Sequence, residues 1–370
     1  MTAAMPSGGL RVRIVGTGLI GASLGMALSR KGFQVSLDDP SPTAAALARD
    51  LGAGVLAADT IGAPDVVIVA APPDVVADVV ARELLQWPNA VVTDAASVKG
   101  AVLKALQDKD ADLSRYVGSH PMAGREKSGV VAAQVDLFEG RSWVVAPGPQ
   151  ASSDAIGVVR QIAAAAGSAV LVMTPDEHDA AVAAVSHVPQ IAASLVASRL
   201  RDLPFGAVAL SGQGIRDVTR IAASDPSMWT QILAGNAPAV RSVLESLAEE
   251  LDAVLVALRH LESDAEEGSV GARAVLARTV ADGNAGHARI PGKHGAAPTT
   301  YANVVVVVPD EPGALGRLLR DVGAAGVNME DLRLEHGVGQ PFGLAELSVL
   351  PAAVQPLMAV LNSLGWRVHE

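Results

Sequence analysis

The sequence predicts a doubly wound α/β domain, an all-α domain after it, and a C-terminal βαββαβ domain. Two observations carry this prediction. Short β-branched runs alternate with alanine-rich helical patterns as far as residue 174, and helical spacing without such runs follows to residue 282. We therefore expect domains at residues 9–174, 175–282 and 300–370, with a linker at residues 283–299.

Seven apolar runs predict the sheet of the first domain. Each run is short and mostly continuous, which is typical of strands that helices cover on both faces. The segments between the runs are long enough for crossover helices, so we expect a mostly parallel sheet. The runs are residues 11–16, 33–37, 65–71, 90–95, 115–119, 142–147 and 169–173.

Apolar residues at helical spacing predict the second domain. A helical domain this rich in alanine packs its helices closely, and we expect it to form a homodimer. Glycine, proline and alanine then dominate the linker. Its Arg289, Lys293 and His294 make it locally basic, so it is either a solvated linker or a mobile loop that reaches an anionic ligand. The helical runs are residues 178–200, 225–261 and 268–281.

The C-terminal residues return to alternating strands and helices. Strands are expected at 302–310, 327–337, 344–350 and 366–370, with helices at 311–326 and 352–365. This βαββαβ order is that of a ferredoxin-like module.

The composition excludes several classes of function. The formal net charge is −11, which disfavours nucleic acid as a partner but allows an anionic small molecule bound by a local arginine cluster. The absence of cysteine excludes disulfides, zinc-thiolate sites and thiol nucleophiles. No apolar signal segment precedes the first strand, and Pro, Asp or Gly cuts the apolar runs short of a membrane span. We expect a cytoplasmic protein without membrane contact and without a metal site.

The glycines of GTGLIG directly follow the first expected strand and precede a helix. A dinucleotide-binding turn of the Rossmann type requires that context. Gly16 permits the tight turn, Gly18 lets a pyrophosphate approach the backbone, and Gly21 lets helix and strand pack closely. A carboxylate is expected about 20 residues further on, where Asp38 and Asp39 lie.

The cofactor expected at this turn is NAD rather than NADP. A carboxylate at the end of the second strand accepts hydrogen bonds from the ribose and repels a 2′-phosphate, and no Arg or Lys follows before Arg49. The pattern leaves open which of Asp38 and Asp39 meets the ribose. The expected cofactor contacts are Gly16, Thr17, Gly18, Leu19, Ile20, Gly21, Asp38, Asp39, Ala71, Pro72 and Ser97.

Three successive expected strands end in chemistry-bearing residues. In a doubly wound sheet the carboxyl ends of the strands face the ligand crevice. Pro72, Ser97 and His120 follow or end these strands, and Lys99 is expected to open towards the same crevice. A histidine in GSHPMAG could be structural. Its place beside a hydroxyl at this crevice favours a general base.

The helical half adds two histidines and two arginines. His178 and His187 are nine residues apart, so on one regular helix they would face opposite ways. We expect His178 to be a surface or structural residue, whereas His187 lies near a kink at Pro189 and could enter the cleft. Arg216 and Arg220 are four residues apart and therefore neighbours on one helical face. They suit a dicarboxylate ligand, although salt bridges with nearby acids such as Asp217 would explain them equally well.

The motifs VGTGLIGASLG, TDAASVKG, GSHPMAGREKSGV, HDAAVAAVSHVPQ and RDVTRIAASDPSMW, in this order, resemble those of prephenate dehydrogenases and their arogenate-using relatives. The resemblance covers residues 11–282. PDEPGALGRLL and GVNMEDL resemble an ACT domain. The resemblance implies NAD-dependent oxidative decarboxylation of prephenate to 4-hydroxyphenylpyruvate in tyrosine biosynthesis. Aromatisation of the ring would drive the loss of CO2.

Roles for individual residues follow from the resemblance. It implies that His120 accepts the proton of the ring hydroxyl, that Ser97 binds the same hydroxyl, and that Arg220 binds a substrate carboxylate. The further substrate contacts it implies are Arg216, His187, Glu126 and Trp229. Trp229 would close the pocket from a neighbouring subunit. Two departures from the family pattern are the second strand VSLDD and Gln190, where another histidine is expected.

Alternatives remain open at this point. An arogenate dehydrogenase would use the same residues on a substrate that differs in one amino group. A non-catalytic NAD-binding sensor would not need His120, Ser97 and Arg220. A β-hydroxyacid dehydrogenase would present a lysine from the helical domain, and SHVPQIAASLV contains none. The ACT-like module either packs the protein or binds an effector, which we expect to be tyrosine, near Gly313 and Asn328.

Overall fold

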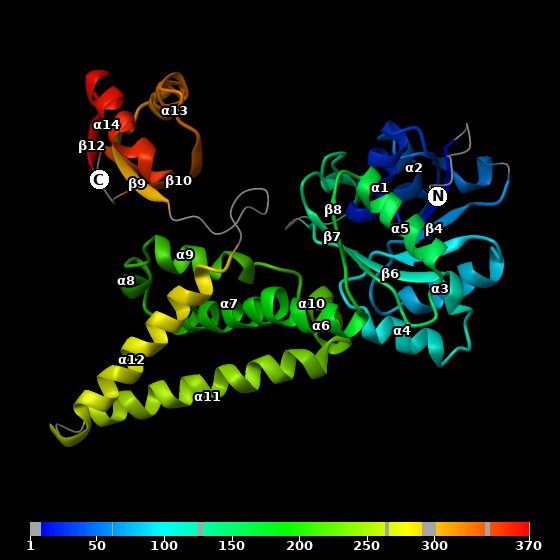
Figure 1. Ribbon diagram of the computed structural model, residues 1–370, viewed down its shortest axis with the longest axis horizontal. Helices are drawn as coiled ribbons and strands as arrows, with labels where there is room; N and C mark the ends of the chain where they lie inside the picture. Colours follow the sequence, from blue (N-terminus) through cyan, green and yellow to red (C-terminus); the bar gives the residue numbers. More distant parts are fainter. Residues whose placement is uncertain are drawn as a thin grey trace. The chain divides into compact units, whose positions relative to one another are not determined.

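The computed structural model describes residues 9–60, 62–124, 129–262, 266–290, 301–336 and 341–369. Its internal contacts divide the chain into two compact units, Met1–Glu249 and Glu250–Glu370 (Figure 1). The sheet domain and the first helices after it therefore belong to one unit. The division falls inside a long helix rather than in a glycine-rich segment.

An eight-stranded sheet forms the frame of the first unit. Its strand order is β3-β2-β1-β4-β5-β6-β7-β8, and all pairs from β3 to β6 are parallel. β7 is antiparallel to β6, and β8 is parallel to β7. All seven predicted strands are present, and the eighth, β3, has only two residues. The bounds are β1 Arg11–Val15, β2 Gln34–Asp38, β3 Val55–Leu56, β4 Val66–Val69, β5 Val91–Asp94, β6 Tyr116–Pro121, β7 Ser142–Ala146 and β8 Ala169–Val172.

Helices cover both faces of this sheet. Val66 and Ile68 of β4 belong to one buried cluster with α1, α2 and α5, while Val67 and Val69 belong to another with α3 and α4. Successive side chains of a strand point to opposite faces, so a strand buried on both sides is apolar throughout. This is the predicted doubly wound arrangement. The helices are α1 Leu19–Arg30, α2 Pro42–Asp50, α3 Val76–Gln86, α4 Gly100–Gln107 and α5 Ser153–Ala165.

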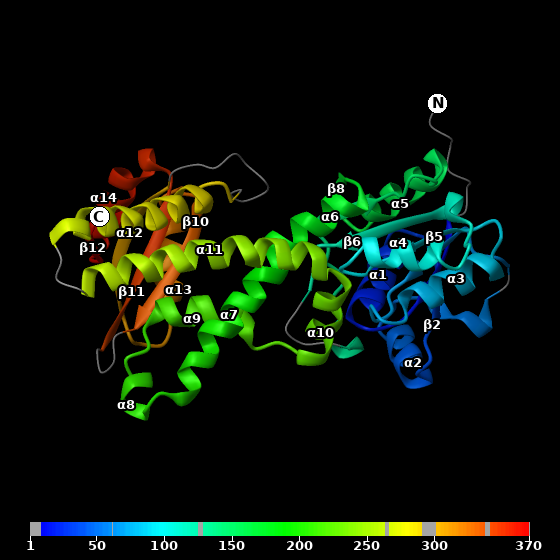
Figure 2. The ribbon, with the colours of Figure 1, turned by 90° about the horizontal axis from the view of Figure 1, so that it is seen from below.

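A long helical stretch begins where the sheet ends. Thr174 and Glu177 form a reciprocal capping box at its start. α6 Pro175–Val182 runs through a π-helical turn, Ala183–His187, into α7 Val188–Arg199 (Figure 2). Pro189 lacks an amide hydrogen and its ring crowds the preceding turn, and the wider π turn relieves both defects. The helix therefore continues through a residue that usually ends one.

This stretch corrects one expectation about apolar runs. Residues 175–202 are long and apolar enough, by length and composition alone, to span a membrane. We expected proline to cut such runs, but Pro189 does not interrupt the helix. The side chains of His178, Asp179 and His187 are nevertheless buried within the first unit. One side of the stretch is therefore buried in that unit, while Val185 and Leu195 are exposed.

The other helices after the sheet are α8 Phe205–Val208, α9 Gln213–Thr219, α10 Pro226–Gly235, α11 Ala237–Glu262 and α12 Glu266–His287. α12 passes the linker boundary predicted after residue 282, because Gly283 and Gly286 are tolerated near the end of a long helix at a cost of about 1 kcal/mol each. Residues 291–300, the rest of that linker with Lys293 and His294, lie outside the described residues.

The C-terminal residues form a four-stranded antiparallel sheet with two helices in the predicted βαββαβ order. The strand order is β10-β11-β9-β12. Val304, Val306 and Val308 alternate along β9 and pack beneath Leu318 and Leu357 of the helices. The bounds are β9 Ala302–Pro309, α13 Ala314–Ala324, β10 Met329–His336, β11 Phe342–Val349, α14 Val354–Ser363 and β12 Arg367–His369.

Candidate active site

The glycine turn between β1 and α1 has the shape that a pyrophosphate requires. Gly16 has a φ of +96°, and a Cβ there would collide with the carbonyl oxygen of Ala70. A Cβ on Gly21 would collide with the carbonyl oxygen of Gly16. Around Gly18, by contrast, no heavy atom lies within 4 Å of the place of a Cβ. Gly18 caps α1 without a side-chain hydrogen bond, so the first amides of α1, at Leu19 and Ile20, can bind an anion.

The two aspartates after β2 have different partners. Asp39 accepts hydrogen bonds from the Thr17 backbone amide at 2.6 Å and from Thr17 Oγ1 at 2.9 Å, so it lies directly against the glycine turn. Asp38 pairs instead with Arg13 at 2.6 Å, and Arg13 also pairs with the buried Glu83 at 3.0 Å. Asp39 is thus the carboxylate beside the turn. The pattern of the sequence could not distinguish the two.

The strands that end near Pro72, Ser97 and His120 are neighbours in the sheet, as the sequence predicted. β4, β5 and β6 are adjacent and parallel, and Asp94 of β5 is in register with Gly118 of β6. Ala71 and Pro72 follow β4, Ser97 follows β5, and His120 is the penultimate residue of β6. Ser97 and His120 are both half-buried, and within the described residues no hydrogen bond joins them.

His120 heads a chain of hydrogen bonds that reaches into α6. Its Nδ1 lies 2.9 Å from Nε2 of His178, and Nδ1 of His178 lies 2.8 Å from Oδ1 of Asp179. The two imidazole rings meet edge to face, with centroids 5.1 Å apart. Asp179 also accepts hydrogen bonds from the backbone amides of Lys99 and Gly100 at 2.9 and 2.8 Å. Asp179 therefore fastens α6 to the start of α4.

His178 was expected to be a surface or a structural residue, and the surface half of that prediction is wrong. This residue is fully buried and touches His120. His178 and His187 were expected on opposite faces because nine residues at about 100° each turn the helix by half a revolution. The π turn between them absorbs one residue, which leaves an angle of about 80°. Both rings therefore act electrostatically on His120.

Asn236 and Trp229 hold the His187 ring. Asn236 Nδ2 donates to the carbonyl oxygen of Asp179 at 2.7 Å and lies 3.2 Å from His187 Nδ1. Trp229 of the same chain packs edge to face on His187, with centroids 6.1 Å apart. Gln190, at the departure from the family pattern, is buried and lies 3.4 Å from Ser224. Sequence reasoning missed Asn236, and no motif marks it.

A second polar network lies in the sheet beneath His120. Lys99 is buried and its Nζ donates to a carboxylate oxygen of Asp94 and, at 2.7 Å, to the carbonyl oxygen of Ser119. Tyr116 donates to the other Asp94 oxygen at 2.7 Å. The prediction that Lys99 opens towards the crevice is therefore wrong. Its side chain points into the sheet, because a buried ammonium needs a carboxylate partner.

These surroundings shift several pKa values. Burial, with repulsion from His178, Lys99 and His187, holds the pKa of His120 well below its usual 6.5. Burial also lowers the pKa of His187, and it lowers that of Lys99 despite the attraction of Asp94. The His178 ring and the two backbone amides lower the pKa of Asp179, although burial opposes them. At neutral pH, His120 is thus an uncharged imidazole able to accept a proton.

The two predicted carboxylate-binding arginines form no ion pair with any residue that the structure describes. Arg216 lies in α9 and Arg220 begins a 3₁₀ turn, Arg220–Ala222, and both segments pack against α7. Both side chains are exposed, and neither forms a salt bridge within the described ranges. Asp217 is instead bound by Gln213 at 2.8 Å, so the alternative of surface pairing with Asp217 is wrong. Glu126 lies outside the described residues.

The second unit and the far side of the sheet hold the remaining candidates. Gly313 precedes α13 with a φ of +87°, and Asn328 is exposed before β10.

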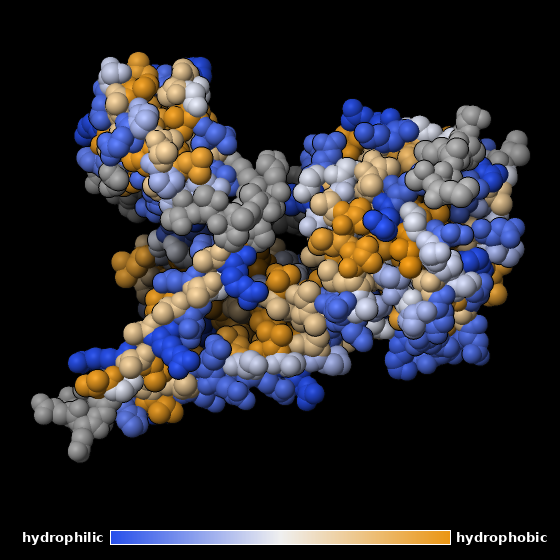
Figure 3. Space-filling model, viewed as in Figure 1, coloured by the Kyte–Doolittle hydropathy of each residue, from blue (hydrophilic) through white to orange (hydrophobic). Residues whose placement is uncertain are grey.

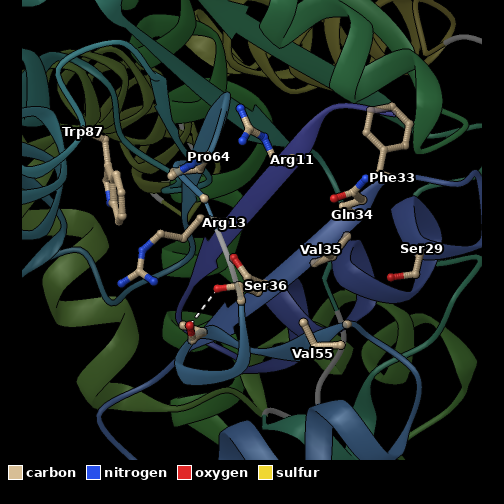
Figure 4. A pocket seen from close by; sticks show the side chains of 14 residues that line it. Arg11, Arg13, Ser29, Phe33, Gln34, Val35, Ser36, Val55, Pro64 and Trp87 are labelled. Atoms are coloured by element: carbon tan, nitrogen blue, oxygen red, sulfur yellow. Dashed lines mark hydrogen bonds between the residues drawn. The ribbon is translucent and has the colours of Figure 1, made fainter. Parts of the chain in front are cut away.

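A cavity of about 640 Å³ opens on the sheet face of Arg13, Ser36 and Val55, beside Trp87, and includes no predicted site residue (Figure 4). Its arginines are already ion-paired, so it is not part of the histidine site. Within the parts of the chain that the structure describes, no three His, Asp or Glu side chains are arranged to hold a metal ion.

Comparison with known proteins points to one family. Residues 24–187 match the model of the prephenate dehydrogenase nucleotide-binding domain, and residues 174–268 match that of the prephenate dehydrogenase dimerization domain. The chain is 35% identical over 359 residues to the probable prephenate dehydrogenase NovF of Streptomyces niveus, covering 96% of this chain and 99% of that protein. It is 28% identical over 335 residues to prephenate dehydrogenase of Bacillus subtilis, covering 87% of each. A crystal structure of prephenate dehydrogenase from A. aeolicus, in complex with hydroxyphenyl propionate and NAD+, is 29% identical with a TM-score of 0.61, covering 76% of this chain and 99% of that one.

Proposed function

Because the chain belongs to the prephenate dehydrogenase family, we propose that it catalyses the NAD-dependent oxidative decarboxylation of prephenate to 4-hydroxyphenylpyruvate. One observation of the site carries this proposal. The imidazole of His120, the penultimate residue of β6, is uncharged at neutral pH and hydrogen-bonds through Nδ1 to the buried His178, while its Nε2 has no hydrogen-bond partner among the described residues. A base in this place suits an alcohol oxidation.

His120 accepts the proton of the ring hydroxyl on Nε2 while the hydride leaves the same carbon. NAD, when bound, supplies the hydride acceptor. The bond to the ring carboxylate then breaks, its electron pair enters the ring, and CO2 leaves. His120 returns its proton to the resulting phenolate oxygen, so the reaction releases no net proton. The histidine therefore needs a pKa low enough to be uncharged beforehand, which burial provides.

The other substrate contacts surround this base. Arg220 and Arg216 bind the substrate carboxylates, because both are exposed cations without a described acidic partner. His187, held by Asn236 and Trp229, contributes a polar wall of the pocket. Ser97 binds the ring hydroxyl from the neighbouring strand end, and Glu126 is assigned to the substrate on the family resemblance alone.

The glycine turn would hold the cofactor, because the space beside Gly18 is open and the first amides of α1 can bind a pyrophosphate. Asp39, whose carboxylate lies against Thr17, would accept hydrogen bonds from the adenosine ribose. Asp38 is engaged by Arg13 and shapes the strand end. Leu19, Ile20, Ala71 and Pro72 line the remaining path.

Assembly and regulation complete the proposal. The helical domain forms a homodimer, for which the match to a dimerization domain and exposed apolar residues such as Val185 and Leu195 provide support. Apolar side chains, coloured orange, also reach the surface of the helical part of the chain in Figure 3. The C-terminal module is ACT-like, since its antiparallel strand order is that of a ferredoxin-like sheet. It binds an effector, tyrosine, near Gly313 and Asn328. The enzyme acts in the cytoplasm, where its cofactor and substrate are made.

The test is NADH formation by the purified protein with prephenate and with arogenate, each with NAD and with NADP. The proposal predicts turnover with prephenate and NAD. Turnover with arogenate alone would assign the arogenate reaction instead, and no turnover with either substrate would refute the proposal. Adding tyrosine to the same assay tests the effector, with a variant ending at Thr300 as the control.

A further inference from the structure

Three titratable side chains form a single hydrogen-bonded line that the reaction itself does not require. The line runs from the Asp179 carboxylate through the His178 ring to the His120 ring, over contacts of 2.8 and 2.9 Å. His178 is fully buried, and Asp179 is buried as well. Neither residue can touch the substrate, so any role they have must pass through His120.

The direction of the hydrogen bonds along this line is fixed at its buried end. Asp179 accepts two backbone amides, from Lys99 and Gly100, and these stabilise its ionised form. An ionised carboxylate can only accept, so Nδ1 of His178 must carry the hydrogen between them. His178 is fully buried, and burial disfavours a charge on an imidazole ring. An uncharged ring carries one hydrogen, which leaves Nε2 of His178 as the acceptor. Nδ1 of His120 must then donate to it.

We propose that His178 and Asp179 are positioning residues that hold His120 in the tautomer with the hydrogen on Nδ1 and the lone pair on Nε2. The base then presents its accepting nitrogen to the crevice before any substrate arrives. This inference deepens the proposed function and rests on it only for the kinetic consequence, because the tautomer is a property of the free protein.

The backbone around Asp179 is built for this role. A Cβ on Gly100 would come within 2.9 Å of Oδ2 of Asp179, so the glycine leaves room for the carboxylate to reach the amides at the start of α4. Asn236 holds the Asp179 backbone through its carbonyl oxygen at 2.7 Å. The start of α4 thus holds the carboxylate of Asp179, and Asn236 at the end of α10 holds the backbone of Asp179. Together they fix the position at which the line of hydrogen bonds begins.

Two variants of His178 separate a positioning role from a merely structural one. His178→Phe keeps a planar ring in the buried site but offers His120 no acceptor. His178→Gln loses the ring but can offer a carbonyl oxygen to Nδ1 of His120. Packing alone would favour the phenylalanine variant, whereas the proposed role favours the glutamine variant.

The experiment is nitrogen NMR of the imidazole rings at pH 8, without substrate, combined with kcat and KM for NADH formation. In the wild-type protein we expect His120 to carry hydrogen on Nδ1 and none on Nε2. We expect His178→Phe to shift it towards the opposite tautomer and to lower kcat by at least ~10-fold, approaching the ~100-fold loss of a missing base, with little change in KM for NAD. His178→Gln should keep the wild-type tautomer and recover most of kcat.

A wild-type His120 protonated on Nε2 would overturn the proposal, as would equal tautomers in the two variants. The wild-type spectrum alone decides the first point if a variant does not fold. If the protein turns over neither prephenate nor arogenate, the proposed function fails while the tautomer assignment still stands or falls by the spectrum.

Discussion

The burial of His120 predicts a defined loss of stability in mild acid. Its pKa is held well below 6.5 in the folded protein, whereas in the unfolded chain it has its usual value. Below pH 6.5 the unfolded state therefore binds more protons, and the free energy of unfolding falls as the pH falls. For one such group the loss at pH 5.5 relative to pH 7.5 is at most about 1.4 kcal/mol. In a unit of this size that corresponds to roughly 3–5 °C in Tm.

The assay compares Tm at pH 7.5 and pH 5.5 for the wild-type protein and for His120→Asn. Other groups that titrate in this range, His187 among them, contribute to both proteins and cancel in the difference. The wild type should lose roughly 3–5 °C more than the variant. Equal losses would refute the reasoning, because His120 would then carry the same charge in the folded and unfolded states.

Two further predictions concern the cofactor and the substrate. Asp39→Asn should weaken NAD binding by about tenfold, because it removes a charge-assisted hydrogen bond of about 1.5 kcal/mol. The matched control Asp38→Asn should leave the NAD affinity nearly unchanged. Fluorescence titration with NAD measures both affinities, and equal effects would reverse the assignment of the ribose carboxylate. Arg220→Lys should raise KM for prephenate about 10-fold or more, because lysine cannot make the bidentate contact, and it should not affect KM for NAD. Initial-rate kinetics measure both constants, and an unchanged KM for prephenate would remove Arg220 from the substrate pocket.

The frame of the site could be predicted from the sequence because it depends on local patterns. Continuous β-branched runs specify strands buried on both faces, and parallel strands bring their carboxyl ends to one edge. The spacing of the glycines after the first strand predicts the roles of Gly16, Gly18 and Gly21 in the cofactor turn. The placing of Pro72, Ser97 and His120 at the carboxyl ends of three neighbouring strands followed from these patterns alone.

The partners of His120 could not be predicted because they depend on one irregular turn. Regular helical spacing placed His178 and His187 on opposite faces, and only the π turn before Pro189 brings both towards His120. The contact between His120 and His178 spans 58 residues of sequence, and no local pattern encodes it. The directly following Asp179 was the one available signal, since a His-Asp pair at a capped helix start suits a buried hydrogen bond.

The choice between Asp38 and Asp39 shows a different limit. Successive residues of a strand point to opposite sides, so only one of the two could face the glycine turn. Which one does so depends on the residue at which β2 ends. The boundary of a strand is less certain from sequence than its existence.

The most direct test of the central claim is the turnover of His120→Asn with prephenate and NAD. NAD affinity and Tm at pH 7.5 serve as controls for an intact fold and cofactor site. If His120 is the base, kcat falls by at least ~100-fold while NAD affinity is unchanged. Unchanged turnover in a folded variant that still binds NAD would contradict the assignment.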